Sequence, residues 1–129
     1  AMLAAKTIKT KVIGVSILTS LGESDTLALF NNNLNDQMLN LFKLAKKINL
    51  DGIVCSPLEV EMANKILDKH SIKITPGIRD ISVEDDQVRT MSAYDAVKMG
   101  ATFIVIGRPI TQAEDILIAL QSFSDSINE

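Results

Sequence analysis

The sequence has very few of the residues that build disulfides or metal sites. Among its 129 residues there is one cysteine, Cys55, one histidine, His70, and no tryptophan. One cysteine cannot form an intrachain disulfide, and this count excludes metal sites built from several cysteines or histidines. Because disulfides are typical of oxidising compartments, we expect a reducing, cytoplasmic setting. Cys55 is expected to be a small buried thiol and His70 a solvated residue near a helix end, neither with a functional role.

An excess of positive charge and long apolar runs are also missing. The 13 basic and 16 acidic residues are spread along the chain and give a net charge of −3. No basic stripe stands out, which argues against nucleic acid or an anionic membrane as a partner. No apolar run approaches the roughly 20 residues of a membrane-spanning helix. The opening "AMLAAKTIK" is too short and too weakly apolar for a signal peptide.

Four short runs rich in β-branched residues recur along the chain. They lie at Lys11–Ile17, Gly52–Cys55, Ile72–Ile74 and Thr102–Ile106. Their nearly continuous apolar character, without alternation, is typical of strands covered on both faces, as in parallel sheets. The sequence therefore predicts four buried parallel strands.

Helical patterns separate these runs. "DQMLNLFKLAKKI" places one apolar stripe along a helix, and "FNNNLND" (Phe30–Asp36) before it is expected to be a surface loop. Gly100 is expected to end a helix in the left-handed conformation. The apolar stripe consists of Met38, Leu41, Phe42, Ala45 and Ile48.

Three further helix starts carry capping signals. "SPLE" predicts an N-cap at Ser56 with Pro57 in the first turn and Glu59 completing a capping box. "TQAE" predicts the same arrangement with Thr111 and Glu114, and "SAYD" predicts a looser version with Ser92 and Asp95.

The resulting order is a short helical segment followed by four strand–helix units. Such alternation predicts a parallel α/β sheet with right-handed crossovers. An initial helix without its own strand fits half of an eight-stranded (β/α)8 barrel better than a complete small sheet. We expect a single partial domain over residues 1–129, whose two open sheet edges need the other half or a second copy.

Two of the strands end in a glycine followed closely by an arginine, in "ITPGIR" and "FIVIGRPI". Gly77 and Gly107 lack a Cβ, so backbone N–H groups could approach a phosphate closely. Arg79 and Arg108 carry planar forks that match phosphate oxygens. Because parallel strands present ligands at their carboxyl ends, the pattern predicts a site for a phosphorylated small molecule.

Neighbouring residues fit that prediction. Pro76 and Pro109 stiffen both turns, and a helix expected to begin at Thr111 would point its positive end at the same place. The alternative is that both glycines only make tight turns and both arginines are solvated surface charges.

The sequence resembles the orotidine 5′-phosphate decarboxylase family. "TPGIR" followed by "DDQVRTMSAYDAVKMGATFIVIGRPIT" is similar to the carboxyl-terminal part of these enzymes, and "VIGVSILTSL" and "DGIVCSP" are similar to their fifth and sixth strands. The resemblance covers the whole chain in unbroken order and implies the carboxyl-terminal half, about strands 5–8, of a TIM barrel. It also implies a homodimer that converts orotidine 5′-phosphate to UMP and CO2 without a metal or organic cofactor.

The resemblance further implies a set of substrate-binding residues. Thr19 and Ser20 resemble the pair that meets the pyrimidine edge, and Pro76 would line the pyrimidine pocket. Gln87 resembles the glutamine on the mobile loop after the seventh strand. The phosphate contacts implied are Arg79, Arg108 and the backbone of Gly107.

The family's proton donor is not found in this sequence. The resemblance implies a lysine and aspartates in an Asp-x-Lys-x-x-Asp pattern after the third strand, and no aspartate here has a lysine two residues later. The chain is expected to begin after the fourth strand and to be inactive alone, with orotidine 5′-phosphate or UMP as its ligand. The alternative is a non-catalytic half-barrel module, or a remnant, that binds a nucleotide or sugar phosphate. Ser92-Ala93 replaces the family's usual Thr-Pro and should loosen that helix start slightly.

Overall fold

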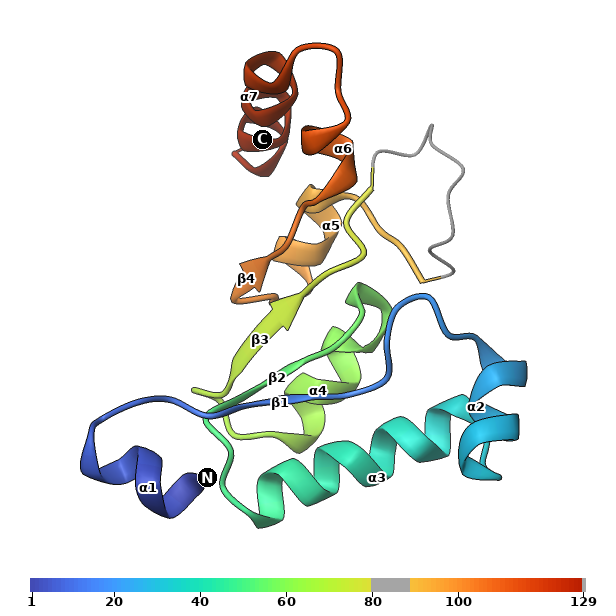
Figure 1. Ribbon diagram of the computed structural model, residues 1–129, viewed down its shortest axis with the longest axis vertical. Coiled ribbons are helices and arrows are strands. Elements are labelled where there is room, and N and C mark those ends of the chain that lie inside the picture. Colours follow the sequence, from blue (N-terminus) through green and yellow to red (C-terminus); the bar gives the residue numbers. More distant parts are fainter. Residues whose placement is uncertain (80–88, 129) are drawn as a thin grey trace.

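A computed structural model describes residues 1–79 and 89–128 of the chain. The sheet runs through the middle of the molecule, with α1 at one end and α7 at the other (Figure 1). The helices and strands, in chain order, are α1 (Met2–Thr7), β1 (Ile13–Val15), α2 (Glu23–Phe30), α3 (Leu34–Lys47), β2 (Gly52–Val54), the 3-10 turn η1 (Pro57–Glu59), α4 (Val60–Ile66), β3 (Ile72–Thr75), α5 (Ala93–Lys98), β4 (Phe103–Ile104), α6 (Arg108–Thr111) and α7 (Ile116–Ile127).

The four expected strands form one parallel sheet in the order β1-β2-β3-β4. Each strand is shorter than the apolar run that predicted it, except β3, which gains Thr75. β2 and β3 pack very closely at Gly52, where a Cβ would lie 2.3 Å from the carbonyl oxygen of Ile72. Because all strands run the same way, the loops after them gather at one edge of the sheet.

The main hydrophobic core lies between the sheet and helices α3 and α4. Met38, Phe42 and Ala45 from the predicted stripe are buried, against Ile53 of β2. Ile48 does not belong to this face: it follows the last turn of α3 and is 46% exposed. The remaining buried members of this core are Ile17, Cys55, Val60, Ala63 and Leu67.

A smaller core lies on the β3–β4 side. Ile78, Ala93 and Ala96 are its buried members. Phe123 and Ile127 of α7 pack against them but are only half-buried. The predicted left-handed glycine is confirmed, because Gly100 follows α5 with φ +102°.

The prediction of a surface loop over Phe30–Asp36 is wrong, because α2 extends to Phe30 and α3 begins at Leu34. Asn31 ends α2 in the left-handed conformation, with φ 52°, and Asn33 caps α3 by accepting a hydrogen bond from the amide of Asp36 at 2.8 Å. Asparagine is suited to both positions, so two helices follow each other with a connection of only three residues, Asn31–Asn33.

The capping predictions had mixed outcomes. Ser92 caps α5, and its hydroxyl accepts from the amide of Asp95. Ser56 also caps its turn, but Glu59 does not complete a box there; its carboxylate binds Arg89 instead. The prediction that a helix begins at Thr111 is also wrong. Thr111 ends the one-turn helix α6, and α7 is capped by Asp115, whose Oδ1 accepts from two amides, at 2.9 and 3.0 Å.

Candidate functional site

A cavity of about 270 Å³ opens where β1, β2 and β3 end. It brings together Thr19, Ser20 and Pro76, three residues that the family resemblance implies at the pyrimidine end of a ligand. Two hydroxyl groups beside apolar walls are typical of a small-molecule site, in which few polar groups orient the ligand. The lining consists of Val15, Ile17, Leu18, Thr19, Ser20, Val54, Cys55 and Pro76.

The loop that carries Thr19 and Ser20 is tied to the neighbouring strand. Both the amide and the hydroxyl of Ser16 donate to the carbonyl of Val54, at 3.1 and 2.7 Å. Beyond it, the amide of Leu21 donates to the carbonyl of Leu18 at 3.0 Å and closes a turn. Thr19 and Ser20 occupy this turn, are half-buried and line the cavity.

Cys55 lines the same cavity. No sequence pattern around it indicated that position. Its side chain is buried, as expected. Burial, and after it the nearby Glu59 carboxylate, raise the pKa of the Cys55 thiol from 9.0 to about 12, against the opposing charges of Lys73 and Arg89. The thiol therefore stays protonated and acts as a wall of the cavity, not as a nucleophile. His70 is exposed, as predicted.

Arg79 is buried, which excludes the alternative that it is a solvated surface charge. Its guanidinium donates to the carbonyl of Ile78 at 2.8 Å, and its backbone amide donates to the carbonyl of Met91 at 3.0 Å. It also lines a small cavity of about 80 Å³ beside α5 and α7. Arg79 thus lies at a different cavity from Thr19 and Ser20.

Gly107 and Arg108 follow the neighbouring strand. β3 and β4 are paired, with Ile74 opposite Phe103, so residues 79 and 108 both come after strands that end at the same edge. Arg108 is half-buried in the first turn of α6. Gly107 is exposed, and nothing lies within 4 Å of where its Cβ would be. Within the described residues, the fold itself gives no steric reason for glycine at 107.

Gly77 differs from Gly107, because the backbone requires it. Its φ is +82°, and a Cβ there would lie 2.8 Å from the carbonyl oxygen of Arg89. The backbone at Gly77 therefore passes so close to the backbone at Arg89 that no side chain fits between them. Gln87, assigned above to a mobile loop, lies outside the described residues, as do residues 80–88 as a whole.

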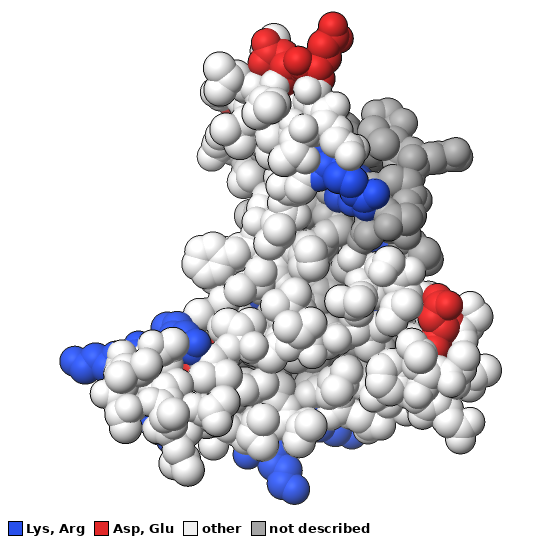
Figure 2. Space-filling view, in the orientation of Figure 1, with Lys and Arg blue, Asp and Glu red and all other residues white. Residues whose placement is uncertain are grey.

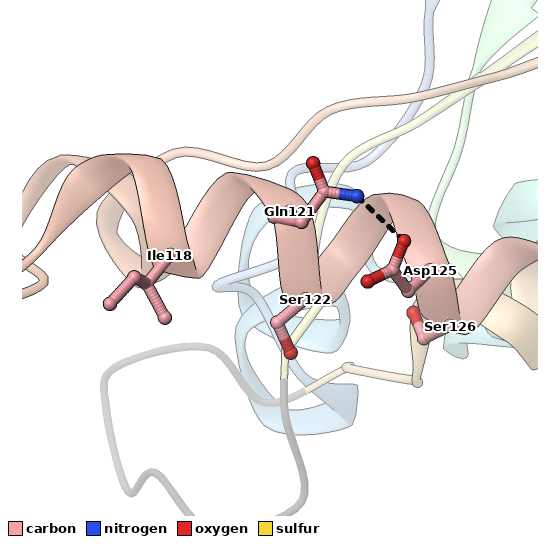
Figure 3. A pocket seen from close by; sticks show the side chains of 5 residues that line it. All are labelled: Ile118, Gln121, Ser122, Asp125 and Ser126. Carbon is pink, nitrogen blue, oxygen red and sulfur yellow. Dashed lines mark hydrogen bonds between the residues drawn. The ribbon is translucent and has the colours of Figure 1, made fainter.

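A larger hollow of about 460 Å³ runs along α7, but it is a weaker candidate. Figure 3 shows its described lining, which comes from α7 alone, and Gln121 there donates a 2.7 Å hydrogen bond to Asp125. A hollow on one helix, with two of its polar groups bound to each other, offers little to orient a ligand. In the described ranges 1–79 and 89–128, no cluster of three His, Cys, Asp or Glu residues could hold a metal ion, and no helix is long and apolar enough to cross a membrane.

Comparisons with known proteins agree with the fold and with the resemblance. Residues 1–123 match the model of the "Orotidine 5'-phosphate decarboxylase / HUMPS family". Orotidine 5′-phosphate decarboxylase of Actinobacillus succinogenes is 43% identical over 118 residues, which are 90% of this chain and 51% of that protein. The Wolbachia pipientis protein of the same name is 45% identical over 108 residues, 83% of this chain and 48% of that one.

A solved structure shows the same relation. The crystal structure of orotidine 5′-phosphate decarboxylase from Lactobacillus acidophilus superposes with a TM-score of 0.71 at 34% identity, and covers 93% of this chain and 50% of that chain. The chain spans about half the length of the curated relatives it matches. The predicted fold, half of a (β/α)8 barrel with parallel strands, is thereby confirmed.

Proposed function

Because this chain belongs to the orotidine 5′-phosphate decarboxylase / HUMPS family, we propose that it supplies the substrate-binding half of an orotidine 5′-phosphate decarboxylase. The observation that carries the proposal is the cavity at the strand ends, where Thr19, Ser20 and Pro76 meet. In this assignment the hydroxyls of Thr19 and Ser20 bind the polar edge of the pyrimidine, and Pro76 packs against its face.

The phosphate is assigned to the edge formed by β3 and β4. Gly107 leaves its backbone open to an approaching oxygen, and Arg108 begins the adjacent turn. Arg79, after the paired strand, provides the second guanidinium. Since Arg79 also donates to the Ile78 carbonyl, its contact with phosphate would share or replace that bond. Gln87 is assigned to the same ligand by resemblance alone.

The chemical step implied by the resemblance requires an Asp-x-Lys-x-x-Asp array, a pattern that this sequence lacks. In the resemblance stated above, an Asp-x-Lys-x-x-Asp array delivers a proton to the carbon that loses CO2. Binding energy from a remote phosphate can offset the cost of ordering the substrate, but it cannot supply that proton. We therefore expect the 129 residues alone to bind ligand without turning it over.

The open edges of the sheet are assigned to a second half-barrel, which completes the eight strands. Apolar side chains are exposed at both edges, with Val15 at 65%, Phe103 at 58% and Val105 at 48% exposure. On the face shown in Figure 2, charged side chains gather toward the periphery and the middle is mostly uncharged. Exposed apolar side chains at the sheet edges suit an apolar partner surface. The second half is either the segment that carries Asp-x-Lys-x-x-Asp or a second copy of this chain.

Calorimetry with UMP and with ribose 5-phosphate tests the binding assignment. Arg108→Met should weaken UMP binding about tenfold to a hundredfold, because a hydrogen bond to a charged group contributes about 1.5–3 kcal/mol. Lys69→Met, which removes an exposed positive charge before β3 at the opposite edge, should change nothing. Equal affinity for both ligands would favour the alternative, a non-catalytic sugar-phosphate module, and no binding of either would favour a remnant.

A turnover assay tests the catalytic assignment separately. The purified chain should produce no UMP from orotidine 5′-phosphate. Adding the amino-terminal half of a relative, which carries the lysine, should restore decarboxylation. UMP production by the chain alone would refute the expectation of inactivity.

A further inference from the structure

Arg89 binds two separate parts of the molecule near the candidate site, the turn η1 and the loop after β1. It is 3% exposed, and one of its terminal nitrogens donates to the carboxylate of Glu59 at 2.6 Å. The other terminal nitrogen donates to the carbonyls of Ile17 and Leu18, at 2.9 and 2.7 Å. Its backbone amide donates to the carbonyl of Thr19 at 3.3 Å. Three successive carbonyls of the loop after β1 are therefore bound by one residue.

The segment that contains Arg89 is itself fixed to the end of β3. The amide of Met91 donates to the carbonyl of Gly77 at 3.3 Å, and Ile78 and Met91 form an isolated parallel bridge. Glu59 lies in the turn η1 after β2 and is 6% exposed. The Arg89–Glu59 pair thus joins the carboxyl ends of β1, β2 and β3, the three strands that surround the cavity.

Two atoms of this pair have no hydrogen-bond partner among the described residues. They are Oε2 of Glu59 and Nε of Arg89, both buried. Buried polar atoms are costly to leave unpaired, so a pair chosen for stability alone would satisfy them. Arg89 instead uses its hydrogen-bond donors on the carbonyls of Ile17 and Leu18 in the loop after β1.

We propose that Arg89, held by Glu59, is the positioning residue that sets the Ile17–Ser20 loop, and with it the placement of the Thr19 and Ser20 hydroxyls at the ligand. This inference rests on the proposed function only for the identity of that ligand. Arg89 touches no ligand in this assignment and acts through the backbone it binds. Arginine suits this position because two separate nitrogens of its planar fork bind the carboxylate and the two carbonyls, whereas an ammonium carries all its donors on one nitrogen.

Hydrogen exchange tests the loop directly, without any ligand. Arg89→Lys keeps the charge and shortens the reach, so the amide of Leu21, which closes the loop by binding Leu18, should exchange about tenfold faster relative to the amide of Phe42 in α3. Glu59→Gln should give a smaller change of the same kind. Lys73→Met is the matched control, since Lys73 is also a buried cation, 6% exposed, with no hydrogen bond from its side chain to this loop among the described contacts.

Ligand selectivity tests the consequence of positioning. Arg89→Lys should weaken binding of UMP about tenfold and leave ribose 5-phosphate binding unchanged, because the loop serves the pyrimidine end. A purely structural role would lower stability without changing this ratio. The proposal is overturned if the Leu21 amide and the ratio of affinities both match those of the unmodified chain. If the unmodified chain fails to bind UMP, the proposed function fails, while the exchange of Leu21 still decides the role of Arg89.

Discussion

Around β2 the helices α3 and α4 bury whole side chains, among them Met38 and Phe42 at 0% exposure, whereas around β4 the last helix buries none of its described residues. In α7 Leu117 is 76% and Ile118 is 69% exposed. The first region is packed like the interior of a finished domain, and the second has an apolar surface without a covering layer.

This difference separates the two parts of the candidate site. Thr19 and Ser20 come shortly after Ile17, a buried member of the main core, while Gly107 and Arg108 follow β4, on the sparse side. We infer that the cavity at Thr19 and Ser20 is largely formed in the isolated chain, and that the edge at Gly107 and Arg108 depends more on a covering partner. Substitutions on the two sides of the sheet can measure the packing difference on which this inference rests.

The largest effect is expected from truncating phenylalanine on the two sides. Phe42→Ala leaves a cavity in the main core and should lower the free energy of unfolding by about 3–5 kcal/mol, a large part of the 5–15 kcal/mol typical of a whole domain. Phe103→Ala removes a side chain that is 58% exposed and should change it by less than about 0.5 kcal/mol. Urea unfolding followed by circular dichroism measures both, and similar losses would contradict the comparison.

The pH dependence of Cys55 probes the dense side. Its pKa is raised from 9.0 to about 12 in the folded chain, so folding favours the protonated thiol. The contribution to stability is fully present below pH 9 and is lost between pH 9 and pH 12, with about 1 kcal/mol gone by pH 10. Cys55→Ala should remove this part of the pH dependence in urea titrations.

The accessibility of Cys55 can be compared with that of a cysteine introduced on α7. Ser122 is exposed, so Ser122→Cys combined with Cys55→Ala should react rapidly with iodoacetamide at pH 8. The native Cys55 should react only on unfolding. Rapid alkylation of Cys55 in the folded chain would show that the main core opens more readily than its packing indicates.

Removal of the two helix caps should affect different properties, global stability for one and local amide exchange for the other. Asn33→Ala and Asp115→Ala each remove a side chain that caps a helix, worth about 1 kcal/mol. For Asn33 the loss should lower global stability, because α3 belongs to the main core. For Asp115 it should instead accelerate amide exchange within α7, with a smaller global change. Equal global losses would show that α7 folds cooperatively with the rest.

The smallest effect is expected from an ion pair on the surface of α4. Lys65 donates a 2.7 Å hydrogen bond to Glu61, which holds the pKa of Glu61 below its ordinary value of 4.5. Lys65→Met should raise that pKa back toward its ordinary value in an NMR titration while the urea midpoint stays the same. A shifted midpoint would mean that exposed pairs contribute more than packing here.

Composition predicted the number and order of the strands, because short β-branched runs such as Ile72–Ile74 stand out from their polar surroundings. The expected burial on both faces was wrong for β1 and β4, in which no residue is buried, because both are edge strands of the sheet. Helix α2 was missed because Thr26 is its only buried residue, so no apolar stripe marks it. The cap at Thr111 was wrong because the sequence offers two capping residues near each other, and only the structure shows that Asp115 accepts both amides.

The candidate site was less predictable from the sequence than the fold. Thr19, Ser20 and Pro76 could be grouped from the resemblance and do line one cavity. The partners of Arg89 could not be anticipated, because Glu59 and Ile17 lie 30 and 72 residues away along the chain. Contacts over such separations follow from the packing of the whole sheet and have no local pattern.

The close approach of β2 to β3 at Gly52 also bears on how mutational surveys of this family member should be interpreted. Even a methyl group there would collide with a main-chain oxygen of the next strand, so every replacement should be rejected. Such intolerance would mimic that of a residue in contact with substrate, yet its origin is the spacing between two neighbouring strands. A screen scored only by growth would not separate the two, whereas solubility measured alongside it would.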